Sequence, residues 1–400
     1  MLYERHRHEE LADHSWSPDR AEATIRDIVD DTVAAVEDGL WPFHPRETGT
    51  GRSTVIYHGT AGIVTALAYL KSAGREIGDF DIEATLREAW KIYRGKPQKD
   101  QRVPALLTGL GGILLATYGQ TGDASPADRL LQLVRANHNN PADDLMWGAP
   151  GTMCAALQMY DWTGDDVWQE AYVESAASLW ERWWMNERIG CYLWTQQFTG
   201  KRVRWIGACH GQFGNVDALL RGREFLSVDH RKSLLERTEG LLQQLAVEED
   251  GLVNWPSVPS EPEPRMVQWC HGATGVVTAL AQIPEGESEV VDDYLQRAGE
   301  LVWDAGPLEK GHNICHGTAG SGYAMLKLYN RNGESRWLDR ARRLAMHAID
   351  QYRRIYEEWG NGWYSLYTGD PGLACFLQAC IDETDGIPGL DHWPALHSEF

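Results

Sequence analysis

A Gly-x-x-Gly element followed by an apolar run occurs seven times in this chain, and this repeat limits the possible folds more than any other feature. The spacings between successive copies average about 52 residues, which is the length of two helices with their connections. The seven copies begin at Gly59, Gly109, Gly148, Gly211, Gly272, Gly317 and Gly369. The repeat therefore indicates a fold built from seven helical pairs.

Two kinds of helical segment alternate along the chain. The runs after each Gly-x-x-Gly are rich in Gly, Ala, Thr and Leu nearly all round, which suits helices buried on every side. The segments that start at Arg20, Phe80, Asp229 and Ser335 place charges on one face and apolar residues on the other. We expect an all-α fold, a seven-fold α/α toroid or barrel of alternating inner and outer helices, with residues 1–400 in a single domain. Residues 191–207, with large residues flanking "TGKR", predict a β-hairpin.

The residues just before the glycines become candidate functional residues if every inner helix begins at the same end of the toroid. Four of these seven positions carry histidine, in a chain that has 14 histidines. The alternative roles for these histidines are helix capping and packing at the rim, and packing is the preferred interpretation for His58 taken alone. The positions are held by His58, Thr108, Trp147, His210, His271, His316 and Thr368.

Cysteine precedes three of these histidines, at Cys209, Cys270 and Cys315, so the triplet Cys-His-Gly occurs three times. Two consecutive inner helices would bring Cys270 beside Cys315 and His316, and thiolate and imidazole together suit zinc. Three protein ligands leave a fourth position for another group, which is the pattern of a catalytic zinc site. Two thiolates would also offset the positive ends of the helix dipoles.

Composition limits the kinds of binding partner and the cellular compartment that we expect for this protein. The chain has 37 basic and 58 acidic residues and a formal net charge of -21, which argues against binding to nucleic acid or an anionic membrane. No apolar run of about 18 residues occurs, and the first residues lack the apolar region of a signal peptide. We expect a cytoplasmic protein without a membrane span. Its seven cysteines then favour metal or thiol chemistry over disulfides.

With these motifs the sequence resembles the LanC lanthionine cyclases and their eukaryotic LanC-like relatives. The resemblance rests on "YHGTAG", "DLMWGAPG", "ACHGQFG", "WCHGATG", "ICHGTAG" and "SLYTGDPG", which span nearly the whole chain. It implies one Zn²⁺ held by Cys270, Cys315 and His316, with His210 as the catalytic histidine and Asp144 as its acidic partner. Asp144 also has a structural interpretation as a helix N-cap.

Other positions refine the resemblance. It leaves Cys209 and His271 outside the zinc ligands. His271 directly after the first zinc cysteine matches the eukaryotic type, whereas bacterial cyclases usually have tyrosine there. The nearest preceding arginine, Arg265, follows a proline-rich loop. These departures favour a LanC-like protein over a dedicated lantibiotic cyclase.

The activity implied by the resemblance is thioether formation, in which a thiol from a peptide cysteine or from glutathione adds to dehydroalanine or dehydrobutyrine in a peptide or protein. Zinc would activate the thiol, and His210 would protonate the α-carbon or take the proton of the thiol. A separate dehydratase or kinase would supply the dehydrated substrate.

Two further classes of function remain open at this stage. One is a zinc-containing protein that binds a thiol or peptide without turnover. The other is a carbohydrate-active enzyme on an α/α barrel, which would require paired carboxylates where this chain has histidines.

Overall fold

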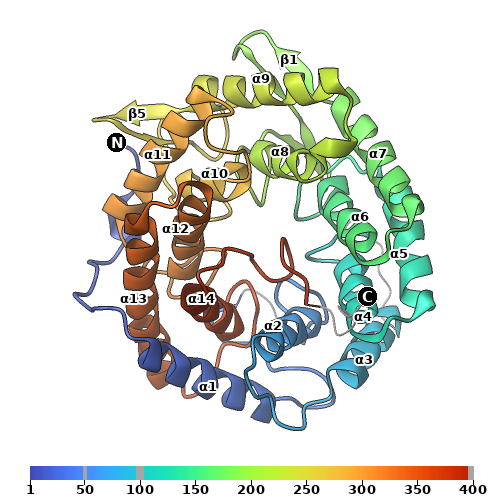
Figure 1. The fold of residues 1–400 in the computed structure, drawn as a ribbon, viewed down its shortest axis with the longest axis vertical. Coiled ribbons are helices and arrows are strands. Elements are labelled where there is room, and N and C mark those ends of the chain that lie inside the picture. Colours follow the sequence, from blue (N-terminus) through green and yellow to red (C-terminus); the bar gives the residue numbers. More distant parts are fainter. Residues whose placement is uncertain (48–51, 96–102, 395–400) are drawn as a thin grey trace.

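The computed structural model describes residues 1–47, 52–95 and 103–394, in which fourteen α-helices form a closed ring of two layers (Figure 1). The inner layer consists of α2 (Thr60–Ser72), α4 (Leu110–Thr121), α6 (Ala149–Thr163), α8 (Gln212–Arg221), α10 (Ala273–Leu280), α12 (Thr318–Asn332) and α14 (Asp370–Asp382). The outer layer consists of α1 (Pro18–Ala34), α3 (Ile82–Gly95), α5 (Ala124–Asn137), α7 (Asp166–Glu181), α9 (Val228–Leu245), α11 (Glu289–Ala305) and α13 (Ser335–Trp359). The predicted toroid of alternating inner and outer helices is confirmed.

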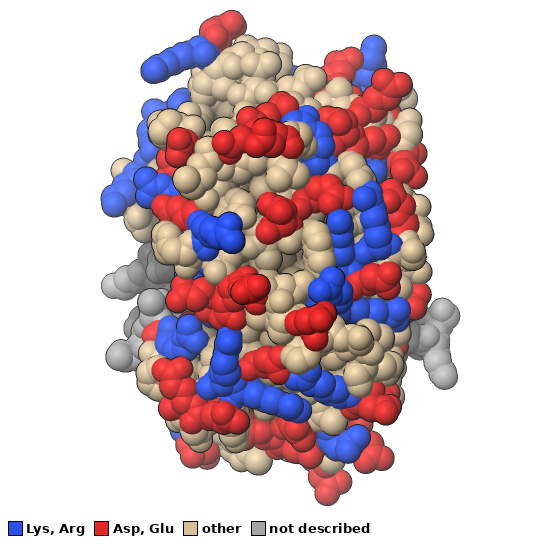
Figure 2. Space-filling view, turned by 90° about the vertical axis from the view of Figure 1, so that its left-hand side faces the viewer, with Lys and Arg blue, Asp and Glu red and all other residues tan. Residues whose placement is uncertain are grey.

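The two layers differ in burial as their sequences predict. In the inner helix α14, every residue from Asp370 to Cys380 is buried. In the outer helix α13, buried residues such as Trp337, Ala341 and Leu344 recur every three or four positions, so one face packs against α12 and α14. The opposite face is charged, and Figure 2 shows acidic and basic side chains interspersed over this side of the ring, the left-hand side of Figure 1.

The second glycine of each repeat lies where two backbone segments touch. A Cβ added at these glycines would lie only 1.8–2.5 Å from the carbonyl oxygen six residues earlier, in all seven repeats. The glycines concerned are Gly62, Gly112, Gly151, Gly214, Gly275, Gly320 and Gly372. The first glycine of each repeat is the N-cap of its inner helix. The motif therefore packs each incoming segment against the start of its helix, which brings equivalent residues to the same end of the ring.

Three short antiparallel hairpins lie around the ring in the part of the chain that the structure describes. The predicted one pairs β3 (Gln196–Phe198) with β4 (Lys201–Val203), and its turn residues Thr199 and Gly200 both have positive φ, as tight hairpin turns require. The others pair β1 (Trp184–Asn186) with β2 (Cys191–Leu193) and β5 (Val247–Glu249) with β6 (Leu252–Asn254). These two were not predicted, because strands of three residues carry almost no periodic signal.

Segments from both ends of the chain complete the ring. Helix α1 packs against α13 and α14, and the Glu9 carboxylate lies 2.9 Å from Nε2 of His347 on α13. After α14 the chain turns into the middle of the ring (Figure 1), where Leu390 is buried and Lys327 Nζ donates to Asp391 at 2.7 Å. None of the described helices combines the length and the apolar character needed to cross a membrane.

Candidate metal centre and active site

One backbone position in each repeat, two residues before the first glycine, builds the floor of the candidate site. Backbone hydrogen bonds join this position in neighbouring repeats, from Cys315 to Tyr367 at 2.9 Å, from Tyr367 to Tyr57 at 3.2 Å and from Tyr57 to Leu107 at 2.8 Å. Four consecutive repeats are thus linked directly at this level. The same position in the other three repeats is held by Met146, Cys209 and Cys270.

Cys270, Cys315 and His316 come together as the repeat predicts. Their two Sγ atoms and one imidazole nitrogen all lie within 4.8 Å of one another, and Cys315 Sγ is 3.5 Å from His316 Nε2. Gln268 Nε2 donates to Cys270 Sγ at 2.8 Å, and the His316 backbone N–H donates to Asn313 Oδ1 at 2.9 Å. Two sulfurs and an imidazole that converge in this way fit the ligand set of Zn²⁺.

The surroundings of the two thiols also fit a metal. Hydrogen bonding with Cys315 and burial raise the pKa of Cys270 well above its usual range. Burial raises the pKa of Cys315, and the Cys209 thiol adds to this effect. The thiols are therefore neutral without a cation, and a cation that binds them must displace their protons. Such a site has a metal affinity that rises with pH.

Asp144 and His210 form a hydrogen-bonded dyad at the same end of the ring. Asp144 Oδ2 lies 3.0 Å from His210 Nδ1, and Asp144 Oδ1 accepts the Trp147 backbone N–H at 3.0 Å. Asp144 is fully buried, whereas the His210 side chain is 19% exposed. The N-cap interpretation of Asp144 was wrong, because the N-cap of α6 is Gly148.

The charge of Asp144 raises the pKa of the His210 imidazole. Burial alone would lower the pKa of His210, but Asp144 raises it through charge and hydrogen bonding, so the net shift is upward. With Nδ1 held by the carboxylate, Nε2 is the nitrogen free to exchange a proton with a ligand. This arrangement suits a general acid that keeps its proton to higher pH than a free imidazole does.

Aromatic rings line one wall of the site. Phe198 of the β3–β4 hairpin stacks on Trp147 with centroids 4.1 Å apart and planes 9° apart. Trp147 contacts His210 at 4.3 Å and Trp205 at 5.8 Å, and His210 lies 5.9 Å from His271. All five rings are partly exposed. They offer an apolar surface that runs from the hairpin toward the cysteines.

The remaining residues that the sequence nominated lie in different surroundings. Cys209 is buried beside the Cys315 thiol, outside the group of three ligands. Burial, together with the neighbouring His210 and His316, lowers the pKa of His271 to about 3, so its ring is neutral. His58 packs against Phe43 and Tyr57. The remaining candidate, Arg265, has a side chain that is 61% exposed and lies 3.8 Å from the Glu4 carboxylate.

Sequence reasoning missed two residues that contact the thiols. Gln268 donates to Cys270, as described above. The Tyr57 hydroxyl is hydrogen-bonded with the Cys315 thiol, and burial with the nearby thiols raises the pKa of Tyr57 well above its usual range. Tyr57 occupies the same repeat position as the three cysteines, so an alignment of the repeats with one another would have found it. No comparable signal marks Gln268.

Comparisons with known proteins give matches over most of the chain. Residues 52–391 match the family described as lanthionine synthetase C-like protein. The chain is 27% identical over 380 residues to glutathione S-transferase LANCL1 of Danio rerio, covering 88% of this chain and 87% of that protein. It is 32% identical over 315 residues to LanC-like protein GCL1 of Arabidopsis thaliana, covering 71% of this chain and 70% of that protein.

Among solved structures, nisin cyclase superposes with a TM-score of 0.63 at 15% identity, covering 91% of this chain and 95% of that one. At this identity the likeness shows a shared fold. The match to the sequence family spans the repeats that supply Asp144, His210, Cys270, Cys315 and His316. The chain therefore belongs to the lanthionine synthetase C-like family.

Proposed function

We propose that this protein is a zinc-dependent enzyme that adds a thiol to dehydroalanine or dehydrobutyrine in a peptide or protein and so forms a thioether. The observation that carries the proposal is the convergence of Cys270, Cys315 and His316 within 4.8 Å, at the end of the ring that also holds the Asp144–His210 pair. Three protein ligands are the number found in catalytic zinc sites, whereas structural sites use four.

Each group then has a defined task. Zinc, when bound by Cys270, Cys315 and His316, would supply the positive charge that keeps an incoming thiol as thiolate near neutral pH. The S–C bond forms at the β-carbon, and the π electrons of the C=C bond move toward the neighbouring carbonyl. His210 donates its proton to the α-carbon, and its neutral imidazole regains a proton from the next thiol, so the net change is addition of S–H across the double bond. Asp144 holds His210 Nδ1 throughout, which leaves Nε2 for this transfer.

The thiol has two chemically reasonable sources. Relatives of this chain carry the names glutathione S-transferase and, among solved structures, nisin cyclase. His271 after the first zinc cysteine supports the eukaryotic type, so we propose glutathione as the first thiol to test and a cysteine of the same peptide as the second. The dehydrated residue must come from a separate enzyme that eliminates water from Ser or Thr, or phosphate after their phosphorylation by a kinase.

We also propose that the protein works in the cytoplasm. All seven cysteines are free thiols in the structure, and five of them lie outside the three-ligand group. Reduced thiols of this kind persist where glutathione and thioredoxin keep the compartment reducing.

Zinc content tests the centre directly. Metal analysis of the purified protein should give one zinc per chain, and Cys270→Ala and Cys315→Ala should each lose it. Cys375→Ala is the matched control, because Cys375 is equally buried in α14 and lies outside the three-ligand group. Loss of zinc in the control as well would mean that replacing any buried cysteine disrupts the protein, and would contradict the assignment of Cys270 and Cys315 as ligands.

Turnover decides between an enzyme and a binding protein. A peptide that contains dehydroalanine, mixed with glutathione, should gain the mass of glutathione only in the presence of the wild-type protein. A protein that holds zinc and takes a thiol into the metal shell by X-ray absorption, yet forms no thioether with glutathione or with a peptide cysteine, would be the non-catalytic thiol-binding protein instead.

A further inference from the structure

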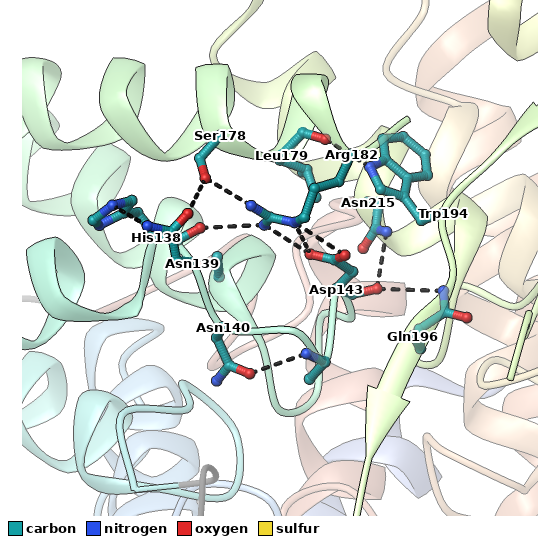
Figure 3. Close-up of polar contacts among 12 residues, drawn as sticks. His138, Asn139, Asn140, Asp143, Ser178, Leu179, Arg182, Trp194, Gln196 and Asn215 are labelled. Carbon is teal, nitrogen blue, oxygen red and sulfur yellow. Dashed lines mark hydrogen bonds and ion pairs between the residues drawn. The ribbon is translucent and has the colours of Figure 1, made fainter. Parts of the chain in front are cut away.

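The segment that carries Asp144 adopts a strained backbone. Asp143, the preceding residue, has a φ of 41°, in the left-handed region that is unfavourable for most residues with a side chain. Its carbonyl oxygen accepts hydrogen bonds from Asn215 Nδ2 at 2.9 Å and from Gln196 Nε2 at 3.3 Å (Figure 3). Residues of α8 and of strand β3 thus hold the peptide that joins Asp143 to Asp144.

The side chain of Asp143 points the other way, into an ion pair with Arg182 (Figure 3). Arg182 Nε lies 3.0 and 3.1 Å from the two carboxylate oxygens, and Nη2 lies 2.8 Å from Oδ1. The rest of the guanidinium is used as well, since Nη1 donates to Ser178 Oγ at 2.6 Å and Nη2 donates to the His138 carbonyl at 3.2 Å. Arg182 is the C-cap of α7, where a positive charge also meets the negative end of the helix dipole.

This pair is placed to determine where Asp144 lies. The Asp143 side chain is 3% exposed, so its negative charge needs a partner. Burial raises the pKa of Asp143, Arg182 opposes this effect and the adjacent Asp144 adds to it. Without Arg182, a buried carboxylate next to Asp144 must protonate or turn toward water, and either change removes the ion pair that fixes the Asp143 side chain.

We propose that the Arg182–Asp143 ion pair positions Asp144 against His210. The two are positioning residues for the proton transfer that the proposed function assigns to His210, and the inference rests on that function for its effect on turnover. The pair connects the outer helix α7 to the segment before the inner helix α6. The left-handed conformation of Asp143 orients the following carboxylate, Asp144, toward the His210 imidazole, which explains why this unfavourable conformation is retained.

A second buried ion pair provides a matched control. Asp217 and Arg221 on α8 lie 3.0 Å apart and are 4% and 18% exposed, close to the 3% and 26% of Asp143 and Arg182. They lie toward the C-terminal end of α8, whereas His210 precedes its N-terminal end. Loss of either pair removes a buried ion pair and lowers stability, although Arg221 keeps a second carboxylate, Asp391, at 3.6 Å. Only loss of the first pair disturbs the Asp144–His210 hydrogen bond.

The test uses Asp143→Asn and Arg182→Met, with Asp217→Asn and Arg221→Met as controls, all in the zinc-loaded protein at a temperature where each variant is folded. Asparagine keeps the shape of Asp143 and tolerates left-handed φ, so this variant removes the charge alone. We expect kcat to fall about 10- to 100-fold in the first two variants, as small misplacements of catalytic groups do. KM for the thiol and zinc content should stay at wild-type values, Arg182→Lys should recover part of kcat, and the controls should keep kcat.

A second readout does not depend on turnover. The proton between His210 Nδ1 and Asp144 should give a downfield NMR resonance in the wild type and in Asp217→Asn, and this resonance should be lost in Asp143→Asn and Arg182→Met. If the wild type adds no thiol to any dehydropeptide, the proposed function fails while the resonance still tests the ion pair. The inference is overturned if Asp143→Asn keeps both kcat and the resonance, or if Asp217→Asn loses them to the same degree.

Discussion

One repeat position has diverged into several chemical roles at the scale of single residues. It holds tyrosine in repeats one and seven and cysteine in repeats four, five and six. The backbone bonds from Cys315 to Tyr367 and from Tyr367 to Tyr57 show that this position is structurally equivalent where repeats adjoin. Because the backbone is shared, the side chain alone decides whether a repeat contributes a metal ligand, a hydroxyl donor or an apolar contact.

The Asp144–His210 pair leads to a prediction about pH. Asp144 raises the pKa of His210, so the protonated acid persists to higher pH than in a free imidazole, and activity should fall as pH rises through that raised pKa. Asp144→Asn removes the charge, which should move this alkaline limit of kcat/KM to lower pH. His210→Asn should lower kcat by about 10²- to 10⁴-fold at every pH. Profiles of kcat/KM against pH check both, and an unchanged limit in Asp144→Asn would contradict the assigned role.

The same pair affects stability with a definite sign. A histidine whose pKa is raised by folding contributes stability below its unfolded pKa, and this contribution is lost as pH rises through the folded pKa. The difference in unfolding free energy between wild type and Asp144→Asn should therefore shrink toward alkaline pH. This comparison supports the kinetic profile without using a substrate.

At the scale of elements, the start of each inner helix depends on steric contact more than on helix propensity. The second glycine of every repeat faces a carbonyl oxygen at a distance that leaves no room for a Cβ. The apolar run behind it would form a buried helix in any case. The glycine allows the segment that precedes each inner helix to lie against the first turn of that helix. The residues of the candidate site come from these preceding segments.

Gly112→Ala should therefore destabilise the protein. Its Cβ would lie 2.2 Å from the Leu106 carbonyl oxygen and 2.4 Å from Ile56 Cγ1, an overlap expected to cost roughly 1–3 kcal/mol or more. Gly240→Ala in α9 is the control, because its Cβ would meet only Cys191 Cβ at 3.9 Å. That variant should be stabilising by about 0.5–1 kcal/mol through helix propensity. Urea denaturation of both variants measures these opposite signs, and equal effects would refute the steric explanation.

At the scale of the whole molecule, closure of the ring brings distant repeats into one site. The first outer helix, α1, packs against the last inner helix, α14, and α14 contacts α2. The three-ligand group joins repeats five and six, while the Asp144–His210 pair joins repeats three and four. A metal bound to that group would therefore link two repeats. This link would add to the stability of a ring that a hydrophobic core already holds together.

Metal removal should lower stability without unfolding the protein. Ligands that bind only the folded state stabilise it by mass action, so a chelator should lower Tm by several degrees while the far-ultraviolet circular dichroism keeps its helical signal. Cys315→Ala, which lacks one ligand, should show little response to the chelator. Complete unfolding of the wild type by the chelator would show that the metal is required for the fold, as it is in small zinc domains.

The sequence by itself determined the architecture and nominated most of the site. Periodicity separates buried from amphipathic helices, and glycine spacing marks where each inner helix begins, because both effects are local. The same repeat register placed Cys270, Cys315 and His316 at one end of the ring, where the structure brings them together. The family resemblance, rather than the pattern, singled out Asp144.

Only the tertiary structure decided which side chains meet across repeats. Asp144 reaches His210 across 66 positions of the chain, and Arg182 reaches Asp143 across 39. Such pairs have no spacing rule, because they depend on how neighbouring helices are rotated and on where a strained turn points a carboxylate. Tyr57, which contacts Cys315, shares the repeat position of the cysteines and could have been found by aligning the repeats, whereas no sequence signal marks Gln268 beside Cys270. Local patterns fix the helices and their ends, whereas long-range packing selects the polar contacts between them.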